Sequence, residues 1–353
     1  MNNSETEDLK RLNYILWLQD LMDETLPEQE EIAGIDIGVG ASCIYPLLGC
    51  ASRRNWTFLG TDIDKRSIRY ARENVKRNGL DSRITIKHND NPERIFLLDE
   101  DRTYHFCMCN PPFYSSQEEI EEGLRNKELE PSAVCTGSDN EMVTAGGEYG
   151  FIKRMINESV TYKTRIKWYT SMIGQKKTIK PLVDLLKSNN ITNYLVTDFC
   201  QGRTKRWGIA WSFDSKRVIS AKSLDVYRPK CQFSVCLPKS MEDIHRILGF
   251  ILDDLDIDYT QPNDCTIQGE PQLNTWSRAA RRRKKLKLEN TTPPEEAEPL
   301  FAFCFELEEK TGCEVKLSWL SGNDRGVFES FWNHIKKRIQ EECGIVRGSA
   351  FNK

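Results

Sequence analysis

The feature that most constrains the fold is a strand, glycine turn and helix unit near the start of the chain. Residues 32–37 are mostly apolar, Gly38 and Gly40 follow them, and a helix is expected from about Ser42, with Pro46 in its first turns, where proline is tolerated. Glycines at such a turn let a ligand approach the backbone closely. The unit predicts an open α/β sheet with a ligand at the carboxyl ends of its strands.

Strands and helices continue to alternate to about residue 213. Helices are expected at 5–22, 65–78, 149–163 and 181–188, and further strands at 56–61, 84–88, 105–108, 166–170, 193–199 and 206–213. The last two strands are separated by a short turn and predict an antiparallel hairpin. The six further strands and the strand at residues 32–37 together predict a seven-stranded sheet. Residues 115–149 show no clear periodicity, and they are expected to form either an active-site loop or a surface insertion.

Two acids lie near the ends of the first two strands. Asp62 comes 24 residues after Gly38, where an acidic side chain holds ribose hydroxyls in nucleoside-binding α/β folds. Alternatively Asp62 caps the next helix, a role that Asp64 would fill as well. Asp36 could bind a cationic amine beside the glycines, and the polar turn at residues 89–92 could contact an adenine ring. The turn lacks the GxGxxG pattern of dinucleotide-binding proteins, which argues against a dinucleotide.

The run Cys109-Asn110-Pro111-Pro112-Phe113 predicts where the chemistry takes place. It follows the strand at 105–108, which the two prolines end. The side-chain oxygen of Asn110 and the carbonyl of Pro111 could accept hydrogen bonds from an exocyclic amine, so that its lone pair points at an electrophile. Phe113 would stack on the ring, a contact worth about 1–3 kcal/mol per base. The simpler alternative is a proline-rich turn with a surface aromatic residue.

Composition limits the classes of protein to consider. A chain of 353 residues with 39% hydrophobic and 29% charged residues is long enough for two soluble domains. The N-terminus has no apolar signal region and no segment resembles a membrane span, so nucleus or cytoplasm is expected. None of the twelve cysteines forms a Cys-x-x-Cys pair, which predicts reduced, mostly buried thiols. Because the net charge is -3, any nucleic-acid contact must come from local patches.

Basic residues gather in two turns of the first 214 residues. Arg203, Lys205 and Arg206 lie in the hairpin turn, and Lys176 and Lys177 are expected in a loop after residue 174. Such residues near a pocket could hold phosphates on either side of an extruded base. The alternative is an ordinary solvated turn.

The C-terminal third has a different composition. After a polar linker at 215–229, residues 230–345 predict strands at 231–237, 257–260, 301–307 and 313–319 and helices at 241–252, 273–286 and 326–340. A Pro- and Glu-rich linker at 288–299 interrupts them. The ten residues from 278 to 287 contain seven cations and no acid, which favours a nucleic-acid patch or a nuclear-localisation signal over a solvated helix end. These cations are Arg278, Arg281, Arg282, Arg283, Lys284, Lys285 and Lys287.

Three runs, residues 34–49, 106–113 and 199–207, resemble the RNA adenine-N6 methyltransferases of the methyltransferase-like protein sixteen and RlmF family. The resemblance implies a class I, Rossmann-like S-adenosylmethionine-dependent domain at 1–214 and a small split α+β RNA-binding module at 230–345. It also implies a helical part ahead of Arg11-Leu12-Asn13-Tyr14, which is short here. The implied methyl donor is S-adenosylmethionine, with no metal, and Arg11 is near the donor carboxylate. The expected donor contacts are Arg11, Asp36, Gly38, Gly40, Ser42, Asp62 and Asn110, and the expected catalytic residues are Asn110, Pro111, Pro112 and Phe113.

The same resemblance implies the reaction. A methyl group would pass from the donor to N6 of a flipped adenine in structured RNA, with U6 small nuclear RNA as first substrate and S-adenosylmethionine synthetase mRNA as second. A monomer in nucleus and cytoplasm, with no membrane partner, is expected. Two alternatives stay open: an N-methyltransferase acting on protein glutamine or DNA, and a catalytically idle RNA-binding protein.

Overall fold

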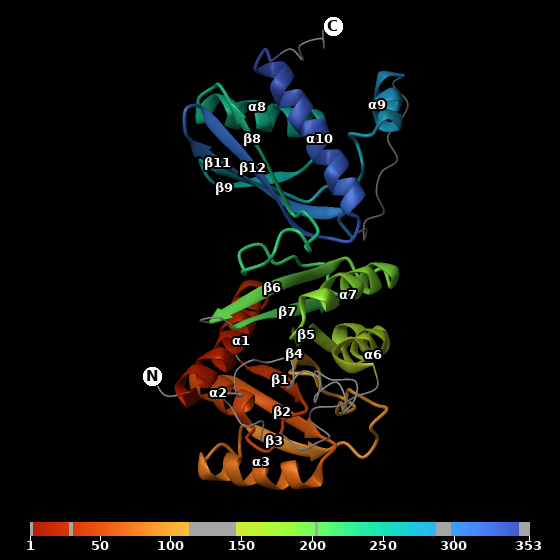
Figure 1. Cartoon of the computed structure of the whole chain (residues 1–353). Coiled ribbons are helices and arrows are strands. Elements are labelled where there is room, and N and C mark those ends of the chain that lie inside the picture. The colour runs from red at the N-terminus through yellow and green to blue at the C-terminus, as the bar shows by residue number, and fades with distance from the viewer. Residues whose placement is uncertain (1–2, 28–30, 113–145, 202–203, 287–297, 346–353) are drawn as a thin grey trace, which may run out of the picture. The chain divides into compact units, whose positions relative to one another are not determined.

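The computed structural model describes residues 3–27, 31–112, 146–201, 204–286 and 298–345 (Figure 1). The chain divides into two compact units. The first contains residues 1–214 and 220–229, and the second contains residues 215–219 and 230–353. The segment 215–229, expected as one linker, is thus shared between the two units. Phe113, Arg203 and the expected loop at 115–145 lie outside the described residues.

The first unit is built on a mixed seven-stranded sheet of order β3-β2-β1-β4-β5-β7-β6. Strands β1 to β5 are parallel, and β7 is antiparallel to both β5 and β6. The chain adds β2 and β3 on one side of β1 and then crosses to place β4 on its other side, so the strand order reverses between β1 and β4. The strands are β1 (Ile32–Ile37), β2 (Trp56–Asp62), β3 (Ile84–His88), β4 (Tyr104–Cys109), β5 (Ile166–Ile173), β6 (Asn193–Gln201) and β7 (Thr204–Ser212). The predicted seven-stranded sheet is confirmed.

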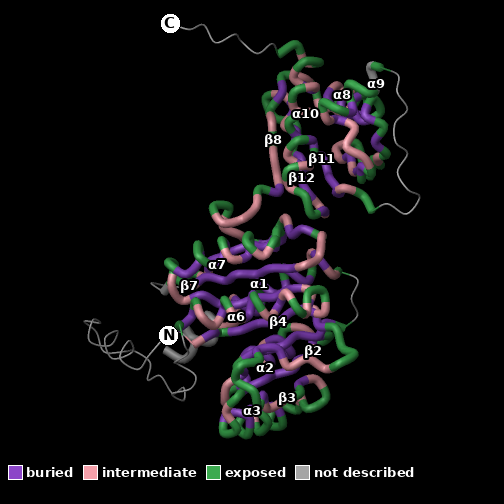
Figure 2. Tube along the Cα trace, turned by 90° about the vertical axis from the view of Figure 1, so that its right-hand side faces the viewer, coloured by how far each residue is buried: buried purple, intermediate pink, exposed green. Residues whose placement is uncertain are grey.

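Helices cover both faces of this sheet (Figure 1). Helices α1 and α2 pack together on one face, α6 and α7 pack together on the other, and α3 contacts β2 and β3 at the edge of the sheet. The bounds are α1 (Asn3–Thr25), α2 (Ile44–Ser52), α3 (Lys65–Arg77), α6 (Gly147–Tyr162), the 3-10 turn η1 (Lys163–Arg165) and α7 (Lys176–Ser188). Since β1 and β4 are sandwiched between helices, their residues are buried almost without interruption (Figure 2).

Aromatic packing holds the middle of the sheet together. The ring of Phe106 on β4 fills the space over Gly34 of β1, where a Cβ atom would come within 2.4 Å of it. Tyr169 and Trp211 stack across β5 and β7 with ring centroids 5.6 Å apart. All cysteines of the described ranges are free, and most are buried, as predicted. The close fit at Gly34 explains why a residue without a side chain stands in a strand interior.

The second unit is a five-stranded antiparallel sheet, of order β8-β12-β11-β10-β9, packed against helices. Its core is rich in Phe and Trp, contributed chiefly by β11, β12 and the last helix. Arg217 is almost fully buried, lies 3.9 Å from the ring centroid of Trp319, and donates to the Gly322 carbonyl at 2.6 Å. The elements are β8 (Gln232–Leu237), α8 (Met241–Asp254), β9 (Tyr259–Asn263), β10 (Thr266–Gly269), α9 (Arg278–Lys285), β11 (Phe301–Glu309), β12 (Cys313–Gly322) and α10 (Arg325–Glu342).

Three expectations about local structure were wrong. Lys176 and Lys177 lie in the first turn of α7 rather than in a loop. Strand β10 was not expected at all. The helix expected from residue 273 begins only at Arg278, because the Thr275 hydroxyl donates to the Leu255 carbonyl at 2.6 Å and Trp276 is buried in the core. These tertiary contacts hold the preceding residues out of the helix.

Candidate active site

The expected donor and acceptor residues meet where β1 and β4 lie side by side. In the register of this pair Ile37 lies opposite Cys109, so the turn that follows β1 and the Asn110-Pro111 segment that follows β4 leave the sheet together. This is the point of the strand order where ligands bind in open α/β sheets. We call the edge at which the parallel strands β1 to β5 end the carboxyl edge. Asn110 is exposed there, Pro111 is buried and Pro112 is half-buried.

Glycine is favoured at Gly38 by the backbone conformation of the turn and not by a lack of room for a side chain. Gly38 has a φ of 72° and Gly40 a φ of 64°, the left-handed region that favours glycine. A Cβ atom on Gly38 would meet nothing within 4 Å, so the space above the turn is open. The amides of Gly38 and Val39 donate to the Thr61 carbonyl at 2.9 and 3.0 Å, which ties the turn to β2. Ser42 is exposed just beyond it.

Of the two roles that were open for Asp62, the helix cap belongs to Asp64. Asp64 is the N-cap of α3, with its carboxylate accepting from the amides of Arg66 and Ser67. Asp62 instead accepts from the Gly40 amide at 2.9 Å through Oδ2 and from the Asp64 amide at 2.9 Å through Oδ1. Burial raises the pKa of Asp62, while these amide bonds oppose the shift. Each carboxylate oxygen of Asp62 keeps a second lone pair, so it could accept one further hydrogen bond, as the expected ribose contact requires.

The polar turn after β3 lies beside Asp62. The amide of Asn89 donates to the Asp62 carbonyl at 2.8 Å. The side chain of Asn89 is committed to its own turn, since it donates to the Arg94 carbonyl at 2.6 Å and accepts from the Asn91 amide. The turn is therefore near the expected donor site, but the Asn89 amide group is already engaged.

Asp36 is a buried carboxyl group with an unused oxygen. It is 1% exposed, and its Oδ2 atom has no hydrogen-bond partner among the described residues. Burial, and then the neighbouring Asp62, raise the pKa of Asp36 to about 8. A buried carboxyl oxygen without a partner is unfavourable, so a ligand that offers a hydrogen-bond donor or a positive charge would stabilise it.

Helix α1 brings a tyrosine to the end of β4 that pattern reasoning overlooked. The Tyr14 hydroxyl accepts the amide of Cys109 at 3.4 Å and lies 2.7 Å from Thr170 Oγ1, which donates to the Cys107 carbonyl at 2.8 Å. With the Thr170 proton used in this way, Tyr14 donates to Thr170. The chain of bonds fixes the backbone directly before Asn110. The available signal was the unusual polarity of the segment that ends in Tyr14.

Arg11 also lies on α1, and its charge affects the buried hydroxyl group of Tyr45. Tyr45 is buried, with its ring edge-on to Tyr14 at a centroid distance of 5.8 Å. Burial and the charge of Asp36 raise the pKa of Tyr45, and the charge of Arg11 opposes this rise. Arg11, Tyr45 and Asp36 thus interact electrostatically near the start of α2. The charge of Arg11 is thus felt at Tyr45, and its expected contact to a donor carboxylate stays a prediction.

Cations flank the carboxyl edge on the side of β5 and β7. Lys176 and Lys177 are exposed at the start of α7, directly after β5. Lys205 pairs with Asp198 at 2.8 Å, and Asp198 also pairs with Lys222 at 2.8 Å. Hydrogen bonds from these two lysines lower the pKa of Asp198 to about 2. Asp198 therefore balances part of the positive charge that was assigned to RNA contact.

The remaining cations occupy different surroundings. Arg206 is half-buried, and its charge opposes the rise in pKa that burial causes at Glu148. Arg281, Arg282 and Arg283 are exposed on α9 of the second unit. Lys284 and Lys285 complete that helix, and their side chains lie outside the described residues. The structure thus gathers Lys176, Lys177, Lys205 and Arg206 at one edge of the first unit and presents the α9 cations on the other unit.

Parallel strands that meet a glycine turn at the reversal of strand order, followed by a β6-β7 hairpin, are the architecture of class I S-adenosylmethionine-dependent methyltransferases, and the chain is of this class. A family model described as RNA methyltransferase matches residues 9–215. The chain belongs to this RNA methyltransferase family. No helix among the described residues is long and apolar enough to cross a membrane.

Curated relatives and a solved structure agree with this assignment. A U6 small nuclear RNA (adenine-(43)-N(6))-methyltransferase of Schizosaccharomyces pombe is 35% identical over 349 residues, covering 94% of this chain and 86% of the relative. The RNA N(6)-adenosine-methyltransferase METTL16 of Homo sapiens is 42% identical over 212 residues, covering 58% of this chain and 37% of that protein. The human METTL16 catalytic domain, solved in complex with MAT2A 3'UTR hairpin 1, matches with a TM-score of 0.52 and 41% identity, covering 58% of this chain and 69% of that chain. The resemblance found in the sequence is confirmed.

Proposed function

We propose that the chain transfers a methyl group from S-adenosylmethionine to N6 of an adenine in structured RNA, with U6 small nuclear RNA as the first substrate. The observation that carries this proposal is the register of β1 and β4, which brings the glycine turn and Asn110-Pro111 to the same point of the carboxyl edge. The relative of which the chain covers 86% is named for methylation of U6 small nuclear RNA.

The residues of the carboxyl edge suit the methyl donor. The open space over Gly38 accommodates its methionine part, and Asp62 is fixed by two amides where a ribose would lie. The unused oxygen of Asp36 favours a cationic ligand, and Arg11 supplies a positive charge for a carboxylate. Gly40 shapes the turn and Ser42 is exposed beyond it. When bound, the donor supplies an electrophilic methyl group on a sulfonium sulfur.

Asn110 and Pro111 hold the amine that accepts the methyl group. The amide oxygen of Asn110 and the Pro111 carbonyl accept hydrogen bonds from N6, so that the nitrogen lone pair is directed at the methyl carbon. Pro112 stiffens the segment, and Phe113 stacks on the adenine. N6 forms the new carbon–nitrogen bond as the carbon–sulfur bond breaks, and N6 then releases a proton to solvent. Orientation supplies most of the rate enhancement in such a direct transfer.

Cations around the carboxyl edge hold the RNA on both sides of the flipped adenine. We assign phosphate contacts to Lys176, Lys177, Arg203, Lys205 and Arg206 in the first unit. The α9 cations Arg281, Arg282, Arg283, Lys284 and Lys285 add contacts from the second unit. These contacts position the RNA without reading its sequence.

A second RNA substrate is favoured by the solved human relative, which holds a MAT2A 3'UTR hairpin. Hairpins of S-adenosylmethionine synthetase mRNA are therefore the second candidate. We further propose that the chain acts as a monomer and is present in nucleus and cytoplasm. The basic run at 278–287 supports its entry into the nucleus. Light scattering of the purified chain and fractionation of cells that express it test these two points.

The decisive experiment incubates the full chain with donor labelled in the methyl group and with U6 transcripts, total RNA, DNA or protein. Nucleoside analysis of the U6 RNA should find label in N6-methyladenosine. Asn110→Ala should lower the rate about 100- to 1,000-fold, the scale of removing one hydrogen bond to the reacting group, while donor binding persists in calorimetry. Label in DNA or in protein glutamine, or RNA binding without any label, would overturn the proposal in favour of one of the two alternatives.

A further inference from the structure

Helix α3 carries positive charge that the proposed active site does not use. Its thirteen residues contain six exposed cations and a single acid, Glu73, whereas the whole chain balances 50 basic against 53 acidic residues. The cations are Lys65, Arg66, Arg69, Arg72, Lys76 and Arg77. The local excess is therefore a property of this helix and not of the composition.

The stability of the fold does not account for these charges. Of the six, Arg72 has a structural bond, from Nη2 to the Ile86 carbonyl at 2.9 Å. The other five form no ion pair within the part of the chain that the structure describes. Like charges three and four residues apart repel one another on a helix, and Lys65 and Arg66 lie at its N-terminus, where positive charge is unfavourable. An external anion would remove both penalties.

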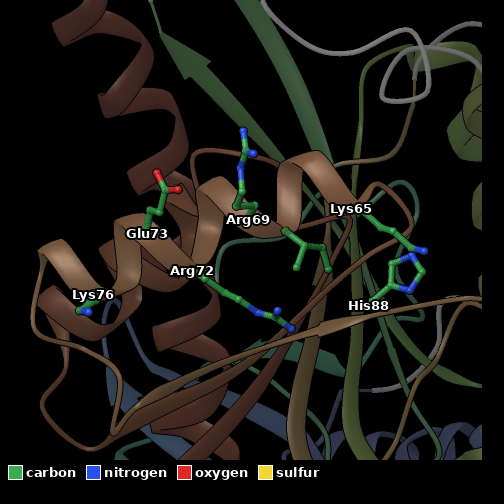
Figure 3. Close-up of a pocket in the computed structure, with 7 residues that line it drawn as sticks. Lys65, Arg69, Arg72, Glu73, Lys76 and His88 are labelled. Carbon is green, nitrogen blue, oxygen red and sulfur yellow. The ribbon is translucent and has the colours of Figure 1, made fainter.

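The cations surround a hollow rather than a flat surface. A shallow cavity of about 530 Å³ lies between α3 and the edge strand β3. Its walls combine four cations with one acid, His88 and one apolar side chain: Lys65, Arg69, Arg72, Lys76, Glu73, His88 and Ile68. Figure 3 shows Lys65 beside His88 at one end, Arg69 in the middle and Lys76 towards the other end. The shape is open and elongated, which suits a chain better than a compact ligand.

An aromatic ring lies on the same helix, beside the cavity and not on its walls. Tyr70 is 37% exposed, and the guanidinium groups of Arg69 and Arg66 lie 4.9 and 6.0 Å from its ring centroid. Planar guanidinium groups and aromatic rings are the surfaces on which unpaired bases stack. The helix therefore offers both phosphate contacts and stacking contacts.

The hollow begins next to the proposed active site. His88 lies opposite Asp62 in the register of β2 and β3, so Lys65 and His88 are at the carboxyl edge. Helix α3 then runs back along the sheet, and the distance from Lys65 to Lys76 along its axis is about 17 Å at 1.5 Å per residue. A single strand of RNA that leaves the active site on this side would pass the cations of α3 one after another, from Lys65 to Lys76.

We propose that this hollow is a second RNA-contact surface, which takes the backbone of the single strand flanking the target adenine. The inference rests on the proposed function, because that function brings RNA to the carboxyl edge. An acidic protein would use the cations but not the exposed Tyr70 and its guanidinium neighbours. The combination favours RNA as the occupant.

The test compares Arg69→Glu/Lys76→Glu with a matched control, Lys163→Glu/Lys187→Glu, which makes the same change of charge at exposed lysines shortly before β5 and β6, away from α3. Fluorescence anisotropy would use a hairpin RNA with one unpaired adenine and single-stranded flanks of either about 4 or about 20 nucleotides. With long flanks, the α3 variant should bind about twentyfold more weakly at 0.1 M salt, and its log-log salt slope should fall by about 1.4, or 0.7 for each lost phosphate contact. The short-flank RNA and the control should show little change.

The outcomes separate this inference from the proposed function. Equal affinity of the α3 variant and the control for long-flank RNA overturns the inference and leaves the function standing. Weakened long-flank binding in a chain that does not form N6-methyladenosine supports the inference and overturns the function. Loss of binding to polyglutamate or phosphatidylserine vesicles in place of RNA also overturns the inference, and a wild-type chain that binds no RNA overturns both.

Discussion

The parallel sheet of the first unit and the antiparallel sheet of the second differ in where their strands end. Strands β1 to β5 all end at the carboxyl edge, so Gly38, Asp62 and Asn110 meet although they are far apart in sequence. Neighbouring strands of the second unit end at opposite edges, and its interior is filled with Phe and Trp side chains. The comparison suggests that the first unit performs the chemistry and that the second contributes RNA affinity through the surface helix α9.

The largest effect expected from the second unit is on RNA affinity alone. Arg281→Gln/Arg282→Gln/Arg283→Gln should remove up to three phosphate contacts, reduce the log-log salt slope by about 2 and weaken U6 RNA binding about 100-fold at 0.1 M salt. The rate at saturating RNA should change little. The control is Arg246→Gln/Lys310→Gln/Lys316→Gln, which alters the same charge on cations already paired with acids. A large fall in the methylation rate at saturating RNA would contradict the proposal that the second unit contributes only RNA affinity.

The buried carboxyl group of Asp36 should make the first unit sensitive to pH. Its pKa, about 8 in the folded chain against an ordinary 3.8, means that the folded state binds the proton more tightly. Its contribution to the free energy of unfolding is complete below about pH 4 and is lost as pH rises through about 8, at up to about 1.4 kcal/mol per pH unit. Relative to Asp36→Asn, the wild type should lose about 2–3 kcal/mol between pH 6 and 8 in urea unfolding.

The control for Asp36 is Asp101→Asn, at an exposed carboxyl group of the same unit. Its pH profile should follow the wild type. If Asp36→Asn also follows the wild type across this range, burial does not raise the pKa of Asp36, and its carboxyl group is ionised in the folded chain.

The Tyr14 contact should matter for turnover more than for donor binding. Tyr14→Phe leaves the Cys109 amide without its acceptor in a buried place, a loss of about 1–3 kcal/mol. We expect about a tenfold lower kcat with nearly unchanged donor affinity, measured by methylation kinetics and calorimetry. Tyr104→Phe is the control, because that hydroxyl bonds Asp99 at the opposite end of the same strand. Equal kcat values for the two variants would contradict the proposal that Tyr14 positions the backbone before Asn110.

The smallest effect is expected at the glycine turn. Gly38→Ala places a side chain at a φ of 72°, which costs about 1–2 kcal/mol, although no atom lies within 4 Å of the new Cβ. Gly79→Ala has the same open surroundings at a φ of 65° but lies after α3. Both should lower the stability to unfolding by similar amounts, while only Gly38→Ala should also weaken donor binding. Equal donor affinities would show that no ligand approaches the Gly38 backbone.

Most elements of the first unit could be predicted because their signals are local. Apolar runs bounded by glycine or proline marked β1 to β4, and the Asp64 cap with a stop at Gly79 bounded α3. Strand β10 escaped because its four residues are too short for a periodic pattern. It forms through pairing with β9 and β11.

The sequence by itself determined where the strands lie along the chain, together with the glycine turn, the acid at the end of β2 and the Asn-Pro-Pro turn. Each of these features follows from the conformations that a few adjacent residues can adopt. Only the tertiary structure decided which residues share hydrogen bonds and charge. Tyr14 and Cys109 are 95 positions apart, and the contact between them exists because α1 packs on a face of the sheet. Likewise Asp198 balances Lys205, and α3 and β3 together form the basic hollow. Such partners depend on distances through space, which no local pattern encodes.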